Sequence, residues 1–187
     1  MKTKNILSGK IVKAAALVLL ASLFFTACLN EAERASNEGI KKTQDGLYGE
    51  AIEEFDRSIS LDPNNPRPYR GRGYVYVMLA MFEEAILDFN KAIELDPNDS
   101  YAFFSRGEIS RRMGKNESAV ADYTRAIDLN PNNPNPSYFH NRGLLLGEMG
   151  RLDESIKDLR EACRLGNSNS CIALEQAMEK KKEEKNK

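Results

Sequence analysis

Few side chains in this sequence are of the types that carry out catalysis or hold metals. Its 187 residues include three cysteines, Cys28, Cys163 and Cys171, and one histidine, His140. Seven residues separate the last two cysteines, so they do not form the Cys-x-x-Cys motif of redox enzymes. A metal site built on them would lack further ligands, because His140 lies a whole helix pair away. We therefore expect neither a bound metal nor a cofactor.

The remainder of the sequence contains none of the familiar catalytic motifs. It has no His-Glu-x-x-His, no Gly-x-Ser-x-Gly, no P-loop and no dinucleotide-binding glycine pattern. With a single histidine, few side chains could act as general bases. We therefore predict that the protein is not an enzyme.

A repeat of 34 residues organises most of the chain. In each of four units a glycine is followed by a small residue, then a large one, then a small one, at fixed distances, with a two-residue slip before the last unit. These positions are Gly39, Gly73, Gly107 and Gly143; Ala51, Ala85, Ala119 and Ser155; Phe55, Phe89, Tyr123 and Leu159; Ser58, Ala92, Ala126 and Ala162. Apolar residues recur at helical spacing, and a single helix pair cannot bury its apolar stripe alone. The pattern predicts stacked helix hairpins and no strands.

This pattern resembles the tetratricopeptide repeat (TPR) family. An aromatic residue stands at place 4 of three units (Tyr69, Phe103, Phe139), and Leu-Asp-Pro or Leu-Asn-Pro closes the first three. Proline cannot continue a helix and ends each second helix, helix B, of the hairpin. The resemblance implies an all-α, right-handed α-α superhelix, a TPR solenoid. Its four hairpins are expected at 32–65, 66–99, 100–133 and 136–169.

A capping helix is expected after the last repeat, within residues 170–187, followed by a charged tail. Ile172, Ala173, Ala177 and Met178 give this helix a thin apolar stripe. Solenoids need such an end with a polar outer face for solubility.

The first 27 residues have the features of a secretory signal peptide. Four lysines precede an uncharged, mostly apolar run from Ala14 to Ala27 that is too short to span a membrane. The run ends in Phe25-Thr26-Ala27-Cys28, which resembles a bacterial lipobox, although Phe25 stands where leucine is usual. The resemblance implies lipidation of Cys28, with 28–31 as a short linker to the repeats. A signal peptide that spares Cys28 and an uncleaved anchor are the alternatives.

A lipidated Cys28 would place the protein in the bacterial cell envelope. Two or three acyl chains hold a protein stably on a membrane where one would not. Leu29 follows the cysteine in place of the aspartate that retains lipoproteins at the inner membrane, which favours the outer membrane. Without residues 1–27 the chain keeps 23 basic and 28 acidic residues, a net charge of −5. This balance does not favour nucleic-acid binding.

Cys163 and Cys171 would then remain as an even pair in an oxidising compartment. In cysteine-rich relatives of the TPR family, a pair with this spacing bridges adjacent antiparallel helices. By this resemblance we expect a disulfide that fixes the capping helix. The loop-entropy model gives it a stabilising contribution of roughly 2.6 kcal/mol.

The resemblance also implies a partner-binding face. TPR proteins bind partners on the concave side, through places 2, 5, 9, 12 and 13 of the first helix, helix A, of each hairpin. The corresponding residues here are Arg67, Arg70, Tyr74, Val77 and Met78; Tyr101, Phe104, Glu108, Arg111 and Arg112; Ser137, His140, Leu144, Gly147 and Glu148. Arginine, tyrosine, phenylalanine and methionine are enriched in protein interfaces. A solvated inner helix face is the alternative interpretation.

The clamp of lysine and asparagine that holds a terminal carboxylate in some TPR proteins is not reproduced, because places 5 and 9 of the first repeat are Ser36 and Ile40. A second recurring pattern combines arginine at place 7 with aspartate at place 23. It predicts ion pairs within repeats two to four: Arg72–Asp88, Arg106–Asp122 and Arg142–Asp158. The first repeat has Glu38 and Glu54 at these places.

Taken as a whole, the resemblance implies a membrane-anchored adaptor that holds a peptide or domain of another envelope protein. A pilotin-like assembly factor for a pilus or secretion complex is one alternative. A structural lipoprotein that associates with itself into homo-oligomers is the other.

Overall fold

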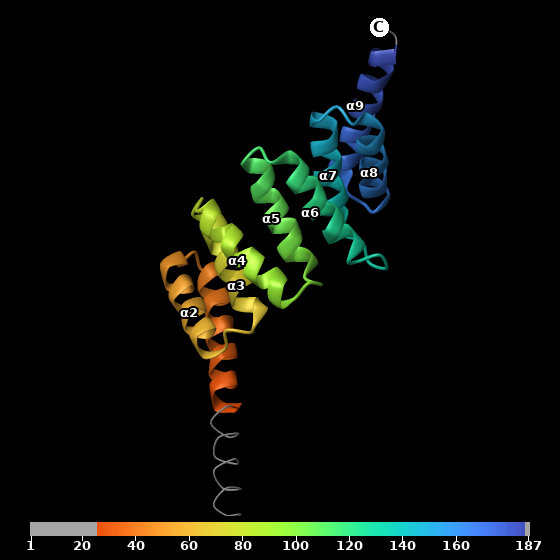
Figure 1. The fold of residues 1–187 in the computed structure, drawn as a ribbon. Helices are drawn as coiled ribbons and strands as arrows, with labels where there is room; N and C mark the ends of the chain where they lie inside the picture. The colour runs from red at the N-terminus through yellow and green to blue at the C-terminus, as the bar shows by residue number, and fades with distance from the viewer. Residues whose placement is uncertain (1–25, 186–187) are drawn as a thin grey trace, which may run out of the picture. The chain divides into compact units, whose positions relative to one another are not determined.

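A computed structural model describes residues 26–185, and every regular element in this range is a helix. Most of the predicted signal peptide, residues 1–25, and the last two residues lie outside the described part. The first helix covers residues 26–44. The others are α2 (Tyr48–Leu61), α3 (Pro66–Met78), α4 (Phe82–Leu95), α5 (Ser100–Arg112), α6 (Asn116–Asp128), α7 (Pro136–Glu148), α8 (Leu152–Arg164) and α9 (Ser168–Lys185) (Figure 1). None of the helices described is long and apolar enough to cross a membrane.

The chain divides into two compact units, the first ending at Val75 and the second beginning at Tyr76. The core of the first unit is formed by Ala51, Phe55 and Val75, with Tyr48 and Ile52 packed against it. The ring of Phe55 packs directly against the backbone at two glycines, Gly39 and Gly71. A Cβ atom added at Gly39 would lie 2.8 Å from this ring, and one at Gly71 would lie 2.5 Å from it. The close packing therefore depends on the absence of side chains at these positions.

The second unit contains the hairpins α5/α6 and α7/α8, preceded by α4 and followed by α9. Its core includes Ala119, Tyr123 and Leu145, with Phe104, Val120 and Met149 packed around them. Here too a glycine lets the helices approach, because a Cβ added at Gly107 would lie 2.9 Å from the Tyr123 ring. The repeated glycines of the sequence thus mark close helix contacts.

The turns between helices A and B repeat a left-handed backbone conformation. Gly46, Gly114 and Gly150 have φ values of +76°, +73° and +78°. Ala80 occupies the same place in the second repeat, with φ of 58°, although a Cβ atom disfavours this conformation. The turn geometry is therefore kept even where its preferred residue is missing.

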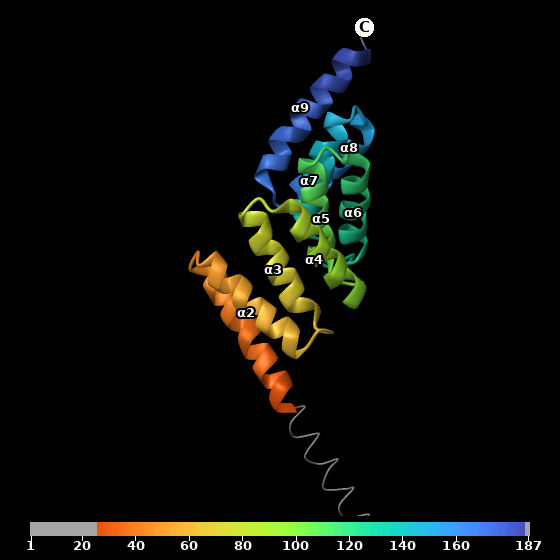
Figure 2. The same cartoon turned by 60° about the vertical axis from the view of Figure 1, so that its left-hand side comes forward.

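Helix α9 packs against α8 and α7, as both views show (Figure 2). The structure contains the disulfide between Cys163 and Cys171, with a distance of 2.03 Å between the Sγ atoms. Further along α9, Lys181 forms an ion pair with Asp153 of α8. The apolar stripe is buried only in part, because the side chains of Ile172 and Met178 are exposed. Ionic and covalent contacts thus contribute to holding a helix that buries little apolar surface.

Candidate partner-binding face

The α5 residues at the family binding places differ in how far their side chains are exposed. Tyr101 is 40% exposed. The side chain of Arg111 is 39% exposed, whereas that of Glu108 is only 23% exposed. Phe104 stacks on Tyr138 of α7, with ring centroids 4.6 Å apart. The outward-directed contacts on α5 therefore come mainly from Tyr101 and Arg111, while Phe104 belongs partly to the junction between hairpins.

Glu108 is fixed by two neighbours that the sequence pattern did not identify. The hydroxyl of Tyr123 donates a hydrogen bond to its Oε1 atom, and the Nδ2 atom of Asn141 donates another at 2.9 Å. Burial raises the pKa of Tyr123, and its hydrogen bond to Glu108 raises it further. Arg111 lies more loosely against the same carboxylate, with Nη2 and Oε2 3.8 Å apart. Glu108 thus has an internal role, and Arg111 keeps donors for an external acceptor.

Helix α7 contributes one residue bound internally and three that line a hollow. His140 Nδ1 lies 2.8 Å from Ser170 Oγ, which is buried at the start of α9. Burial lowers the pKa of His140. Leu144, which is 40% exposed, lies at a hollow of about 280 Å³ with Gly147 and Glu148. Three residues at family binding places of the fourth repeat therefore line one cavity.

Helices α8 and α9 complete this hollow. Leu152, Ser155 and Leu159 line it from α8, and Ala173 and Ala177 line it from α9. The capping helix therefore supplies a wall of the predicted binding face. The sequence pattern of helix A could not have shown this, because α9 belongs to no repeat.

Helix α3 carries the remaining residues of the predicted face. Arg67, Arg70 and Tyr74 belong to the first unit, whereas Val77 and Met78 belong to the second. Tyr74 is 38% exposed, and Met78 is 46% exposed. Arg67 Nη1 lies 3.9 Å from Glu33 Oε1, and both side chains are about half exposed. Arg67, Tyr74 and Met78 are therefore exposed, whereas Arg70 and Val77 are half-buried.

The predicted pairs of arginine and aspartate form in the third and fourth repeats. Arg106 donates from Nε and Nη2 to the two carboxylate oxygens of Asp122, at 2.9 and 2.6 Å. Arg142 binds Asp158 in the same way, at 2.6 and 2.9 Å. The pair Arg72–Asp88 would join residues of the two units and stays a prediction.

Each of these arginines also reaches back to the preceding repeat, which the sequence pattern did not reveal. Arg106 Nη1 donates to Asn90 Oδ1 at 2.7 Å, and Arg142 Nη1 donates to Thr124 Oγ1 at 2.9 Å. In the first unit, Arg72 likewise binds Asp56. The three acceptors all stand at place 25 of their repeats. The polar residue that recurs at this place is the sequence feature from which these contacts could have been predicted.

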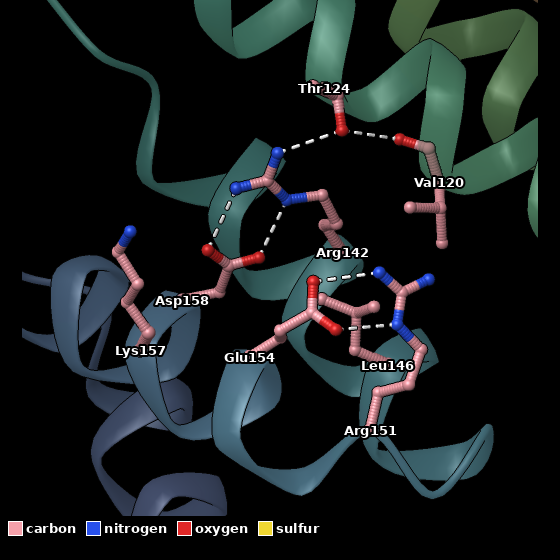
Figure 3. A pocket seen from close by; sticks show the side chains of 8 residues that line it. All are labelled: Val120, Thr124, Arg142, Leu146, Arg151, Glu154, Lys157 and Asp158. Atoms are coloured by element: carbon pink, nitrogen blue, oxygen red, sulfur yellow. Dashed lines mark hydrogen bonds and ion pairs between the residues drawn. The ribbon is translucent and has the colours of Figure 1, made fainter.

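The cavity around Arg142 is built from these structural pairs (Figure 3). It has a volume of about 260 Å³ and lies between α6, α7 and α8. Figure 3 shows Arg142 between Asp158 and Thr124, and Arg151 bound by both oxygens of Glu154 at 2.7 Å. Because the two guanidinium groups are already engaged, this cavity is a weaker candidate for ligand binding than the face of α5 and α7. In the described part of the chain, no three His, Cys, Asp or Glu side chains are grouped to hold a metal.

Models of the tetratricopeptide repeat match the chain at residues 42–79 and 107–150, 66–99, 89–121 and 136–169. A search of curated proteins gave no match. Among solved structures, MamA is similar with a TM-score of 0.72 and 23% identity, over 81% of this chain and 82% of MamA. YrrB, described as a TPR protein with an unusual peptide-binding site, has a TM-score of 0.70 and 22% identity, over 84% of both chains.

The first TPR of Spaghetti (RPAP3), described as bound to the HSP90 peptide SRMEEVD, has a TM-score of 0.61 and 28% identity. The similarity covers 65% of this chain and 94% of that one. These likenesses confirm the all-α TPR solenoid that the sequence predicts. From its repeated hairpins and from these matches, the chain belongs to the tetratricopeptide repeat family.

Proposed function

We propose that this protein is a membrane-anchored adaptor of the bacterial cell envelope that holds a polypeptide partner on the inner face of its helices A. TPR arrays are in general non-enzymatic scaffolds for protein–protein interaction. The observation that carries the proposal is the exposure of Tyr101, Arg111 and Leu144 at family binding places on α5 and α7. Exposed aromatic, guanidinium and aliphatic groups together favour a protein partner.

The chemistry of this face favours a segment with both an apolar and an acidic residue. The hollow beside Leu144 could take an apolar side chain. Arg111 could bind a carboxylate through paired hydrogen bonds, since Glu108 holds it only at 3.8 Å. The RPAP3 domain is described with an acidic peptide bound, which agrees with this kind of ligand.

The proposed anchor is a lipid on Cys28. This residue lies in the helix of residues 26–44, half-buried and without a disulfide partner. Because the same helix carries the first repeat, a lipid at Cys28 would leave almost no tether between the membrane and the repeats. The proposed location is the outer membrane, with the repeats facing the periplasm or the surface.

Site-specific crosslinking in the native cells tests the partner. A photoreactive amino acid placed at Tyr101 or Leu144 should capture one specific protein, whereas the same group at Leu87 of α4 should not. Leu87 is a matched control because it is apolar and 69% exposed but stands at no family binding place. With the photoreactive group at Tyr101, the combined substitutions Arg111→Glu and Leu144→Glu should abolish the capture while leaving the helix content unchanged. Capture that survives these substitutions would exclude the inner face.

The captured protein also decides between the alternatives. A secretin or pilus subunit would identify a pilotin-like factor, and an enzyme that processes peptidoglycan would identify an enzyme scaffold. Capture of a second copy of this chain would identify a self-associating structural protein. Labelling with radioactive palmitate tests the anchor, because the Cys28→Ala variant should lose the label.

A further inference from the structure

Repeats two to four share a stacked pair of side chains on helix A. The place-7 arginine lies over the place-4 aromatic ring, with distances to the ring centroid of 5.9 Å for Arg72 over Tyr69 and 5.5 Å for Arg106 over Phe103. The distance is 6.0 Å for Arg142 over Phe139. Such contacts between a cation and a ring are attractive. The pair is therefore a regular feature of this chain.

The third repeat shows the complete surroundings of this pair. The centroid of its ring, Phe103, lies 5.9 Å from a second guanidinium group, that of Arg125. Arg125 is in α6, at place 26 of the repeat. Its place-7 arginine, Arg106, donates two hydrogen bonds to the carboxylate of Asp122, at place 23. This position of the repeat therefore accommodates an aromatic ring near two guanidinium groups, and an arginine bound to a carboxylate.

The first repeat keeps the surroundings but lacks the pair itself. Place 4 is Ala35 and place 7 is Glu38, so both the ring and the arginine are missing. Place 26 is still an arginine, Arg57, and place 23 is still acidic, Glu54. The first repeat therefore offers the contacts that the ring and the arginine make elsewhere.

A hollow of about 520 Å³ lies at this position in the first unit. Its lining consists of Ala35, Glu38, Glu54 and Arg57, together with Glu31, Arg34 and Ala27, the last residue of the predicted signal peptide. Ala35 is only 4% exposed and forms an apolar floor. The volume is within the range of about 300–1,000 Å³ that is typical of ligand pockets. The missing side chains thus correspond to an open space.

Two carboxylates of this hollow, those of Glu38 and Glu54, are weakly neutralised. Arg57 Nη1 lies 3.9 Å from Glu54, and its Nη2 atom binds Glu31 instead. Glu38 has Lys41 at 4.0 Å, and its side chain is 43% exposed. Such exposed contacts contribute little, so a new cation could replace or join them at low cost.

We propose that this hollow, the first-repeat socket, binds a helical segment of a partner protein that carries an aromatic residue and an arginine three positions later. The ring lies on Ala35 beside Arg57, as Phe103 lies beside Arg125. The arginine binds Glu38 and Glu54, as Arg106 binds Asp122. This surface uses places 4, 7, 23 and 26 and is distinct from the inner face, so it goes beyond the function proposed above. A second copy of the chain is a poorer occupant, because Arg106 and Arg142 are engaged within their own repeats.

A designed peptide tests the chemistry of the socket. The probe is a fluorescein-labelled, alanine-rich helix with one phenylalanine and one arginine three residues later. Fluorescence anisotropy is measured with protein produced from the full-length gene and purified as the host cells process it. We expect binding that weakens about tenfold when the phenylalanine is replaced by alanine or the arginine by glutamate. Absence of binding, or equal binding of all three peptides, would overturn the proposal.

A variant that fills the socket tests its location. Ala35→Phe combined with Glu38→Arg introduces the aromatic residue and the arginine that the later repeats carry. This variant should fold, with a melting temperature no lower than that of the wild type. It should bind the probe at least tenfold more weakly. Glu54→Arg is a second, single substitution with the same expected loss. Glu53→Arg is the matched control, because it makes the same charge change at the exposed neighbouring position, and it should bind normally. Arg111→Glu, on the inner face, should also bind normally.

Three results would contradict the location. They are full binding by the filled variant, equal losses in Glu53→Arg and Glu54→Arg, and loss of binding in Arg111→Glu. Light scattering tests whether the occupant is a second copy of the chain. A dimer that forms in the wild type but not in the filled variant would show that the socket joins two copies, which would overturn the proposal of a partner protein.

Discussion

The first and third repeats have the same backbone plan but different charges at equivalent places. In both, a glycine at place 8 lies against the ring at place 24, Gly39 against Phe55 and Gly107 against Tyr123. At places 7 and 23 the third repeat has a paired arginine and aspartate, whereas the first has two glutamates. Helix packing therefore depends on the small and large apolar places, which both repeats keep, while the charged places can differ between repeats.

The largest expected effect comes from breaking a pair of arginine and aspartate. The Asp158 side chain is 5% exposed and that of Arg142 is 18% exposed, so Asp158→Ala leaves a mostly buried arginine without its partner. We expect a loss of about 3 kcal/mol in the free energy of unfolding, measured by urea denaturation. Glu54→Ala in the first repeat should cost less than about 1 kcal/mol, because its contact with Arg57 is long and exposed. Equal losses would mean that the fourth repeat, with its paired arginine and aspartate, does not differ from the first in this respect.

A smaller effect should be shared by the two repeats. Gly39→Ala and Gly107→Ala place a methyl group 2.8 and 2.9 Å from the rings of Phe55 and Tyr123. We expect each to destabilise the protein by about 1–2 kcal/mol, since overpacking outweighs the better helix propensity of alanine. Gly49→Ala is the control, because no atom lies within 4 Å of its added methyl group. It should stabilise the protein by up to about 1 kcal/mol. A stabilising Gly107→Ala would refute the packing argument.

The turn of the second repeat should gain from a glycine. Ala80 holds a φ of 58°, which its counterparts Gly46 and Gly114 adopt without a Cβ atom. Left-handed backbone costs other residues about 1–2 kcal/mol, and the greater freedom of glycine in the unfolded chain offsets part of this. Ala80→Gly should therefore raise the free energy of unfolding by up to about 1 kcal/mol in urea denaturation. Gly114→Ala should lower it, and a gain there would contradict the interpretation.

The smallest effect concerns place 5, where the fourth repeat has His140 and the first has Ser36. Burial lowers the pKa of His140 below its usual 6.5, so the unfolded chain takes up this proton more readily than the folded one. Its contribution to stability is therefore full above about pH 6.5 and is lost as the pH falls. Urea denaturation at pH 7.5 and 5.5 should show a smaller difference for His140→Gln than for wild type. An unchanged difference would rule out this role.

Ser36 provides the contrast at the same place. Among residues 26–185 its Oγ atom is buried without a hydrogen-bond partner, whereas His140 binds Ser170. Ser36→Ala should therefore leave the stability unchanged or raise it slightly, with no dependence on pH. A clear destabilisation by this substitution would show that the hydroxyl has a partner in solution.

The repeat, the helices and two of the three predicted pairs of arginine and aspartate could be read from the sequence alone. The recurring glycine at place 8 and the large residue at place 24 predict a helix hairpin, and in the structure Gly107 and Tyr123 meet across it. The pairing of Arg106 with Asp122 and of Arg142 with Asp158 follows from the same spacing. Such contacts depend on local geometry that every repeat shares, so the pattern of residue types is sufficient.

The contacts between neighbouring repeats, and those with the capping helix, could be found only in the three-dimensional structure. Glu108 is bound by Asn141 of the next repeat, and Phe104 stacks on Tyr138 there. The hollow beside Leu144 exists because α9 forms one of its walls. These contacts depend on how each hairpin is rotated against the next, and no single repeat encodes that rotation in its own spacing.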